Sequence, residues 1–287
     1  MSKKIIALGG GNIGEEENGK LMPYETKIFD EEIIRISESP KPKILFIGLA
    51  DPQNSQKYFH YFSNAFSKKY GCLCRNIELS DLHSPQKLDI LFDWCDIIYV
   101  GGGNTYTLLN LCEKYGLVNK LLQSYNEGKV MSGVSAGGMC WFKYGNTVNP
   151  DNRKVLLKQS CFGFENLVFS PHCDEINGHF ENVPNLILNE PLVAVSLSNC
   201  SALEILDDKF RCLSTDSFVE RYKIQPFGIR SFWVNDEYFM ENMELNSDYR
   251  KLKDLLNPKP IYNSEVRDDV KKLLKRRNIY FKWKIIH

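Results

Sequence analysis

Short apolar segments alternate with longer amphipathic segments through the first half of this chain. The apolar segments are typical of buried strands, and the amphipathic ones repeat their apolar residues at helical spacing. Such an alternation predicts a mainly parallel sheet that is covered by helices on both faces. Strands are predicted at Lys3–Leu8, Lys43–Leu49, Leu73–Leu79, Ile97–Val100 and Val130–Val134, and helices at Thr26–Ser37, Gln56–Tyr70, Gln86–Phe92 and Tyr106–Leu122, the last interrupted at Gly116.

After His172 the apolar segments become more closely spaced and are joined by tight turns, which favours antiparallel strands or a hairpin layer. The predicted fold is therefore α/β, a three-layer sandwich with a C-terminal antiparallel extension. We expect an α/β domain over residues 1–245 and a basic helical extension over residues 246–287, packed on or flanking it. The later strands are predicted at Val193–Leu197, Ala202–Leu206, Phe210–Ser214 and Phe218–Ile224, and the terminal helices at Asp248–Leu256 and Ser264–Arg277.

The composition is that of a soluble globular protein, with 43% hydrophobic and 25% charged residues among 287. The 36 basic and 36 acidic residues cancel, which gives no electrostatic argument for a nucleic-acid or membrane partner. Apolar runs are too short to span a bilayer, and the first of them is interpreted as a strand rather than a signal peptide. Nine scattered cysteines without paired metal-ligand spacing favour a reduced, cytoplasmic protein that holds no metal.

Three glycine-rich segments follow predicted strands, and the carboxyl ends of parallel strands meet at one edge of a sheet. GGGNIG (9–14) matches a dinucleotide-binding fingerprint, but a polar segment follows it instead of an apolar helix, so a nucleotide cofactor is not expected. VGGGNT (100–105) would let backbone amides approach a ligand closely. GVSAGG (133–138) is the third segment, and we expect the functional site where the three converge.

Ser135 is the leading candidate for a nucleophile. GVSAG fits the pattern Gly, any residue, Ser, any residue, Gly, in which a sharp strand-to-helix turn exposes a serine hydroxyl. An ordinary glycine-rich turn is the alternative interpretation. A serine nucleophile needs a base, and His172, which follows the apolar segment LVFSP, is the best candidate among five histidines. His179 is interpreted as a surface or substrate-side residue.

These motifs together resemble the dipeptidase E and cyanophycinase group of serine peptidases. The resemblance rests on VGGGNT, a GxSAG turn and a Pro-His pair in this order, with LGGG and KILFIGLA near the start, and it extends from Lys3 to about residue 225. It implies a sandwich fold similar to class I glutamine amidotransferases, with Ser135 as nucleophile and His172 as base. It also implies an oxyanion hole from the backbone amides of Ala136 and Gly103, with Asn104 on the substrate side.

The third catalytic residue departs from the family pattern. The family carries an acid on a later strand, whereas this chain reads VSLSNC there, with Ser198 at the expected position as a possible orienting residue. Either the activity is weak or another acid takes this role. The nearby candidates are Asp174, Glu175, Glu204 and Asp207. The segment CDEINGHFENV also replaces a helix that in the family often carries an arginine, so a preference for an amino-terminal Asp is not implied.

The sequence thus predicts a cytoplasmic serine peptidase that hydrolyses short peptides through an acyl-enzyme without a cofactor, as a monomer or homodimer. The alternative is a weakened or inactive relative that binds a peptide or small ligand in the same pocket. A glutamine amidotransferase would need cysteine at the turn, and Cys140 lies beyond it. An α/β-hydrolase esterase would place its acid, formally Asp151, in a segment between Ser135 and His172 that is too short for that fold.

Overall fold

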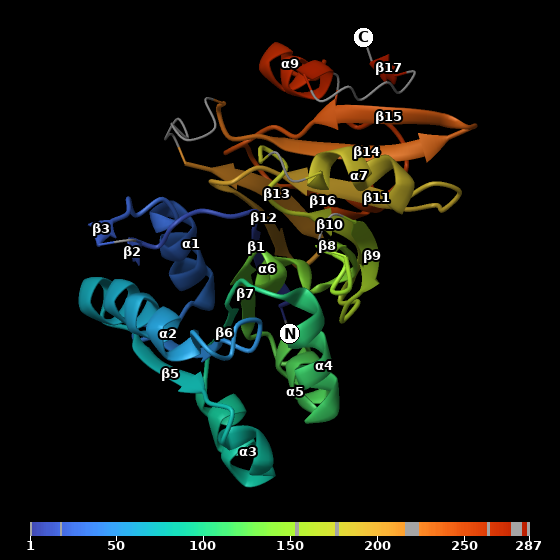
Figure 1. Cartoon of the computed structure of the whole chain (residues 1–287). Helices are drawn as coiled ribbons and strands as arrows, with labels where there is room; N and C mark the ends of the chain where they lie inside the picture. Colours follow the sequence, from blue (N-terminus) through green and yellow to red (C-terminus); the bar gives the residue numbers. More distant parts are fainter. Residues whose placement is uncertain are drawn as a thin grey trace. The chain divides into compact units, whose positions relative to one another are not determined.

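The computed structural model describes residues 2–17, 19–152, 155–175, 178–215, 224–262, 265–276 and 283–285. Two compact units make up the chain. Unit 1 comprises residues 1–7 and 11–138, and unit 2 comprises residues 8–10 and 139–287 (Figure 1).

Unit 1 is built around strands in the order β1-β7-β6-β4-β5. β4 pairs in parallel with β5 and β6, and β6 pairs in parallel with β7. Nearly every residue of β1, β4 and β6 is buried, which means that both faces of these strands are covered. The strands are β1 (Lys4–Leu8), β4 (Lys43–Ile47), β5 (Leu73–Ile77), β6 (Ile97–Val100) and β7 (Val130–Val134), with a small hairpin of β2 (Glu16–Glu17) and β3 (Lys20–Leu21).

Helices connect the strands of unit 1, as the alternating pattern predicts. Phe62 and Phe66 of the second helical segment pack in the core, with ring centroids 4.5 Å apart and Phe46 4.9 Å from Phe62, whereas Tyr58 is exposed. Gly116, with φ of 69°, separates α4 from α5 at the predicted interruption. The helices are α1 (Lys27–Ser37), α2 (Ser55–Ser63) with a π-helical continuation (Asn64–Lys68), a 3-10 turn (Asp81–His83), α3 (Pro85–Trp94), α4 (Thr105–Lys114), α5 (Leu117–Asn126) and α6 (Ala136–Met139).

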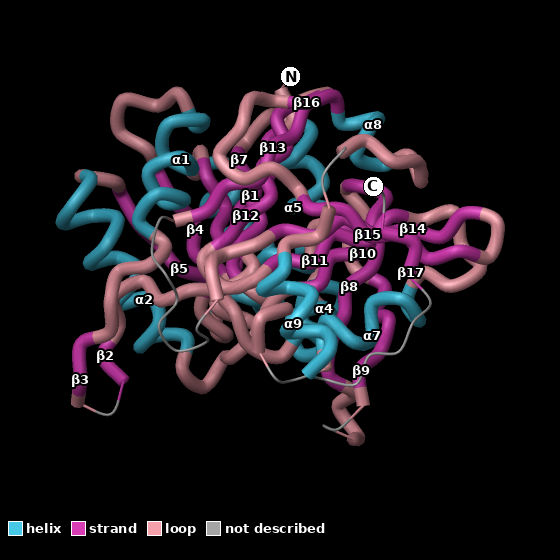
Figure 2. Tube along the Cα trace, turned by 90° about the horizontal axis from the view of Figure 1, so that it is seen from above, coloured by secondary structure: helices cyan, strands magenta, loops and turns pink. Residues whose placement is uncertain are grey.

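Unit 2 contains a mixed sheet in the order β17-β15-β14-β11-β10-β8-β9, whose central strands run side by side in Figure 2. β10 is parallel to both β8 and β11, whereas β14 is antiparallel to β11 and β15. The strands are β8 (Phe142–Val148), β9 (Leu156–Ser160), β10 (Glu165–Ser170), β11 (Val193–Leu197), β14 (Gly228–Val234), β15 (Glu237–Asn242) and β17 (Trp283–Ile285). A second group, β12 (Ser201–Leu206), β13 (Lys209–Ser214) and β16 (Arg250–Lys251), is antiparallel.

One core cluster in unit 2 joins segments from most of its length. α7 (His179–Leu186) contributes Phe180 and Val183, and α9 (Asp268–Arg276) contributes Val270 and Leu274 to the same cluster. The C-terminal helix therefore shares a core with strands that lie before residue 245. The predicted domain boundary at that residue remains a prediction from the sequence.

The structure confirms the predicted α/β fold class, with a mainly parallel sheet in unit 1 and antiparallel strands toward the C-terminus. The helix predicted at Asp248–Leu256 is too long, because β16 occupies its start and α8 spans only Leu252–Leu256. Most of the strand predicted at Phe218–Ile224 lies outside the described residues. No helix within the described part of the chain is long and apolar enough to cross a membrane.

Candidate active site

Ser135 lies at a sharp turn between a strand and a helix of unit 1. β7 ends at Val134 and α6 begins at Ala136, so Ser135 alone makes the turn. Its φ of 56° lies in the left-handed region, which residues with a side chain rarely adopt. Such a backbone conformation costs on the order of 1–3 kcal/mol and persists only where the surrounding structure imposes it.

Two glycines, one on each side of Ser135, let the strand and the helix approach closely. A Cβ atom on Gly133 would lie 2.5 Å from the carbonyl oxygen of Gly137. A Cβ atom on Gly137 would lie 2.0 Å from the carbonyl oxygen of Val100. Both neighbours are backbone atoms, which cannot move aside as the end of a flexible side chain could. The glycines of the GVSAG pattern are therefore required by close packing at this turn.

The glycine turn after β6 lies against Ser135. A Cβ atom on Gly102 would be 3.4 Å from the Cβ atom of Ser135. Gly103 has φ of 141°, and a Cβ atom there would lie 2.6 Å from the carbonyl oxygen of Ala50. The structure thus brings together two of the three glycine turns within unit 1. The convergence of the third turn with them remains a prediction.

Asn104 follows this turn and is exposed. Its Oδ1 accepts a hydrogen bond from the backbone N–H of Thr107 at 2.9 Å and so caps the N-terminus of α4. The backbone N–H of Asn104 donates to the carbonyl oxygen of Ala50 at 2.8 Å. The amide oxygen therefore has a structural role, and the predicted substrate role would fall to Nδ2.

His172 lies just beyond the end of β10 in unit 2, as predicted. Its φ is 53°, so this residue too adopts the left-handed conformation. The backbone N–H of His172 donates to Gly9 O at 3.0 Å, and that of Glu175 donates to His172 O at 3.0 Å, which closes a tight turn. The backbone N–H of Cys173, between them, donates to Leu197 O at 2.9 Å. The backbone of the His172 turn is therefore tied to two neighbouring segments.

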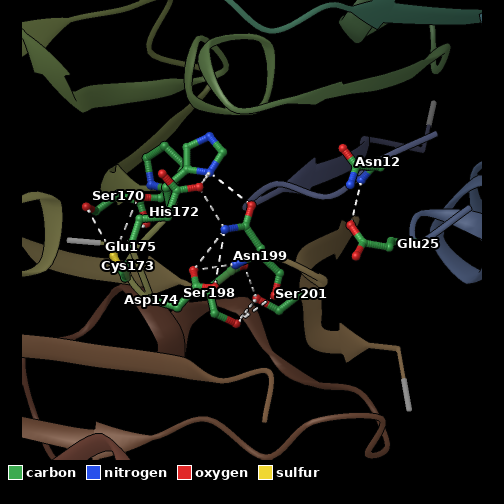
Figure 3. Close-up of polar contacts among 11 residues, drawn as sticks. Asn12, Glu25, Ser170, His172, Cys173, Asp174, Glu175, Ser198, Asn199 and Ser201 are labelled. Carbon is green, nitrogen blue, oxygen red and sulfur yellow. Dashed lines mark hydrogen bonds and ion pairs between the residues drawn. The ribbon is translucent and has the colours of Figure 1, made fainter. Parts of the chain in front are cut away.

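Two acceptor atoms face the same ring nitrogen of His172 (Figure 3). Nδ1 lies 3.0 Å from Oδ1 of Asn199 and 3.1 Å from Oε1 of Glu175. A ring nitrogen between two acceptors is best satisfied when it carries the proton, since an unprotonated nitrogen would face oxygen lone pairs. This tautomer leaves a lone pair on Nε2, which is what a general base requires.

The electrostatic surroundings favour the protonated form of His172. Burial lowers the pKa of the ring, but the hydrogen bond and the negative charge of Glu175 oppose this effect, with smaller contributions from Asn199 and Asp174. The net result is that the pKa of His172 is raised above its ordinary value of 6.5. A base with such a pKa accepts a proton readily near neutral pH.

A buried carboxylate holds Asn199 in place. The backbone N–H of Asn199 donates to Oδ1 of Asp174 at 2.7 Å, and its Nδ2 lies 3.1 and 3.2 Å from the two oxygens of the same carboxylate. Nδ2 also donates to Oε1 of Glu175 at 3.0 Å. Burial raises the pKa of Asp174, although the hydrogen bonds from Asn199 partly offset that rise.

Two glycines near the start of the chain make room for this group. A Cβ atom on Gly10, where φ is 151°, would lie 1.9 Å from Oδ1 of Asn199 and 2.8 Å from Nδ1 of His172. A Cβ atom on Gly9 would lie 2.4 Å from the carbonyl oxygen of Ser198. In the segment GGGNIG (9–14), the glycines at 9 and 10 therefore allow the backbone to lie close to His172 and Asn199.

Ser198, the predicted orienting position, has a different set of contacts. Its Oγ accepts from the backbone N–H of Phe227 at 2.8 Å and donates to Asn199 O at 2.9 Å. The backbone N–H of Ser198 donates to Phe227 O at 3.1 Å. The hydroxyl thus stabilises the turn that carries Asn199, and the described contacts to Nδ1 of His172 come from Asn199 and Glu175.

His179 is buried, with 8% of its surface exposed, so its interpretation as a surface residue is wrong. It begins α7, and its ring centroid lies 6.4 Å from that of His172. Burial, with a smaller effect of the neighbouring His172, lowers the pKa of His179 to about 4. This histidine is therefore neutral over the range in which His172 titrates.

Asn199 was not predicted from the sequence, and Glu175 was only one of several candidate acids. Glu175 could have been found from its position one turn after His172, because residues three apart in a tight turn can meet. No sequence pattern pointed to Asn199. The family pattern places the acid at the neighbouring position, Ser198. The role of Asn199 depends on which residue of the turn points toward the ring.

Comparison with known proteins identifies the family of the chain. The family model for Peptidase family S51 matches residues 5–213, and the chain belongs to that family and is a peptidase. An uncharacterized peptidase, YgaJ, from Bacillus subtilis (strain 168) is 31% identical over 224 residues, which cover 77% of this chain and 92% of that protein. Peptidase E from a Nostoc species is 27% identical over 231 residues, covering 74% of this chain and 86% of its own length.

Solved structures show the same fold. A peptidase from an acI-B1 Actinobacterium superposes with a TM-score of 0.59 at 15% identity, covering 87% of this chain and 96% of that one. A putative peptidase E from Listeria monocytogenes EGD-e superposes with a TM-score of 0.56 at 17% identity, covering 75% of this chain and all of that one. At these identities the likeness concerns the fold alone.

Proposed function

We propose that this protein is a serine peptidase that hydrolyses short peptides through an acyl-enzyme, with Ser135 as nucleophile and His172 as general base. Membership of the peptidase family supports the reaction class. The observation that carries the assignment of roles is the pair of acceptors at Nδ1 of His172, which leaves Nε2 as the proton-accepting atom. The left-handed backbone at Ser135 supports its role as a nucleophile on a sharp turn.

In the first half of the reaction, Ser135 Oγ attacks the carbonyl carbon of the scissile peptide bond while its proton passes to Nε2 of His172. The carbonyl electron pair moves to the oxygen and forms a tetrahedral intermediate. The intermediate collapses, the C–N bond breaks, and the leaving amine takes the proton from Nε2. An acyl group remains on Ser135.

In the second half, a water molecule gives a proton to Nε2 and attacks the acyl carbon. The bond to Ser135 Oγ then breaks, and the serine regains its proton from His172. Backbone amides of Ala136 and Gly103 stabilise the negative oxygen in both halves, a contribution of about 3–4 kcal/mol for each well-placed donor. Nδ2 of Asn104 lies on the substrate side. The proposal requires the His172 ring to reach Ser135 Oγ during the reaction.

The alternative of a non-catalytic relative that binds a peptide or small ligand rested on Ser198 in place of an acid. The contacts of Asn199 and Glu175 with His172 remove that reason for favouring it. We therefore retain a catalytic function as the better-supported proposal.

Turnover of a dipeptide library by the wild-type protein and by Ser135→Ala tests the proposal. Ser135→Ala should lose at least about a thousandfold in turnover, since the nucleophile is absent. Ser63→Ala on α2, whose hydroxyl donates to His60 O, is the matched control and should keep wild-type turnover. Equal turnover by the wild-type protein and Ser135→Ala would reject Ser135 as the nucleophile.

A further inference from the structure

The His172 ring has two neighbours at Nδ1, and only one of them carries a charge. Oε1 of Glu175 is part of a carboxylate, whereas Oδ1 of Asn199 belongs to a neutral amide. Both oxygens lie at hydrogen-bonding distance from the one proton that Nδ1 can hold. The two side chains therefore orient the ring together, but they differ in how they affect its protonated state.

The amide of Asn199 has only one orientation that satisfies its neighbours. Its Nδ2 donates to Asp174 at 3.1 and 3.2 Å and to Oε1 of Glu175 at 3.0 Å. A flipped amide would place its oxygen against these carboxylate oxygens and its NH2 group against the N–H of His172. The two carboxylates thereby direct Oδ1 of Asn199 toward the ring.

Asp174 and Glu175 act on this group from different positions. Asp174 is 2% exposed, and its carboxylate accepts both the backbone N–H and the side-chain amide of Asn199. Glu175 lies on the same tight turn as His172, where its backbone N–H donates to the histidine carbonyl and its carboxylate reaches the ring. Asp174 therefore acts on Asn199, and Glu175 acts on His172 itself.

We propose that Glu175 supplies the negative charge that stabilises protonated His172, and that Asn199, oriented by Asp174, is a positioning residue that fixes the tautomer of the ring. This inference rests on the proposed role of His172 as general base. During catalysis the proton from Ser135 goes to Nε2, while the proton on Nδ1 stays in place. The Glu175 carboxylate accepts no proton, and its charge offsets the charge that develops on the ring.

The test removes the negative charge of Glu175 but keeps an oxygen that can accept the hydrogen bond from Nδ1 of His172. Glu175→Gln keeps an amide oxygen for Nδ1 but removes the negative charge, and Glu190→Gln is the matched control because Glu190 pairs with Lys158 elsewhere in unit 2. The pKa of His172 and the protonated nitrogen of its ring are measured by NMR on protein with isotope-labelled histidine. The measurement is made in the Ser135→Ala background as well, so that it depends on neither substrate nor nucleophile. Steady-state kinetics of the variants with intact Ser135 accompany it.

Glu175→Gln should lower the pKa of His172 by about one unit or more and reduce kcat/KM about 100-fold, mainly through kcat. Glu190→Gln should leave both unchanged. Asp174→Asn should lower the His172 pKa much less than Glu175→Gln does, because the charge of Asp174 makes only a smaller contribution, while a larger fraction of the neutral ring carries its proton on Nε2.

An unchanged His172 pKa in Glu175→Gln would overturn the inference, whatever the activity shows. A lowered pKa with unchanged kcat/KM would also overturn it, because the charge would then have no catalytic role. A Ser135→Ala protein with full turnover would instead reject the proposed function. The two failures are therefore distinguishable.

Discussion

Two groups of residues in the proposed catalytic machinery are held by different physical means: the serine half around Ser135 in unit 1, and the histidine half around His172 in unit 2. Backbone geometry and glycine packing fix Ser135 in unit 1, where a Cβ atom on Gly137 would meet a backbone oxygen at 2.0 Å. His172 in unit 2 also lies on a left-handed turn, but its ring is held by side-chain hydrogen bonds with Asn199 and Glu175. We therefore expect substitutions in the serine half to lower the free energy of unfolding. Substitutions in the histidine half should mainly slow proton transfer.

The largest expected effect is that of Gly137→Ala. The added methyl group would overlap backbone atoms of Val100 that cannot move aside, so we expect a loss of at least about 3 kcal/mol in the free energy of unfolding. Urea denaturation monitored by circular dichroism measures this loss. Gly71→Ala is an informative control, because Gly71 has φ of 72° but nothing within 4 Å of its Cβ position. Gly71→Ala thus measures the cost of a left-handed alanine without a clash, whereas Gly137 has no left-handed φ. A loss in Gly137→Ala no larger than that in Gly71→Ala would contradict the close-packing explanation.

Asn199→Ala should reduce kcat/KM about 100-fold while the protein remains folded. The substitution removes the acceptor that fixes the ring tautomer and takes a side-chain donor away from buried Asp174, at a cost of about 1–3 kcal/mol in stability. Kinetics and thermal unfolding of the same preparation separate the two effects. Wild-type kinetics in this variant would show that Asn199 does not position His172.

The pH dependence of the wild-type enzyme should report the histidine half. His172 must be neutral to accept the serine proton, so kcat/KM falls as the pH drops through its pKa. Because that pKa is raised, the midpoint of the acid limb should lie above pH 6.5. His179, with its pKa lowered to about 4, should not contribute in this range. An acid limb with its midpoint below 6.5 would contradict the described surroundings of His172.

Ser198→Ala should have the smallest effect on activity. Its hydroxyl accepts from the buried backbone N–H of Phe227, so its loss should lower the melting temperature by a few degrees. The His172 pKa should stay unchanged, and kcat/KM should fall by less than about threefold. A loss of activity comparable to that of Asn199→Ala would restore Ser198 as the orienting residue.

The serine half was largely predictable because local rules determine it. Alternating buried strands and helices specify the parallel sheet of unit 1. The GVSAG pattern predicts the turn, since only small residues permit the close contacts of Gly133 and Gly137. Both signals are contained in short stretches of sequence.

The histidine half was predictable only as far as His172 itself. Asn199 meets the ring across a long stretch of chain, and no local pattern distinguishes it from Ser198 beside it. The second sheet was predicted only in part, since Val193–Leu197 was expected as a strand but β14 and β15 were not. β14 carries Arg230, which is fully buried and paired with Glu241 on β15, so these strands lack a continuous apolar pattern. The helix α7 contains Pro184, which is unusual inside a helix and weakens the helical signal.

The most direct test of the account is to locate the residue that a fluorophosphonate probe modifies, by mass spectrometry of peptides from the labelled protein. We expect a single adduct on Ser135, absent in Ser135→Ala and formed much more slowly in His172→Gln. An unlabelled wild-type protein, or labelling that persists in Ser135→Ala, would contradict the central claim that Ser135 is a nucleophile activated by His172.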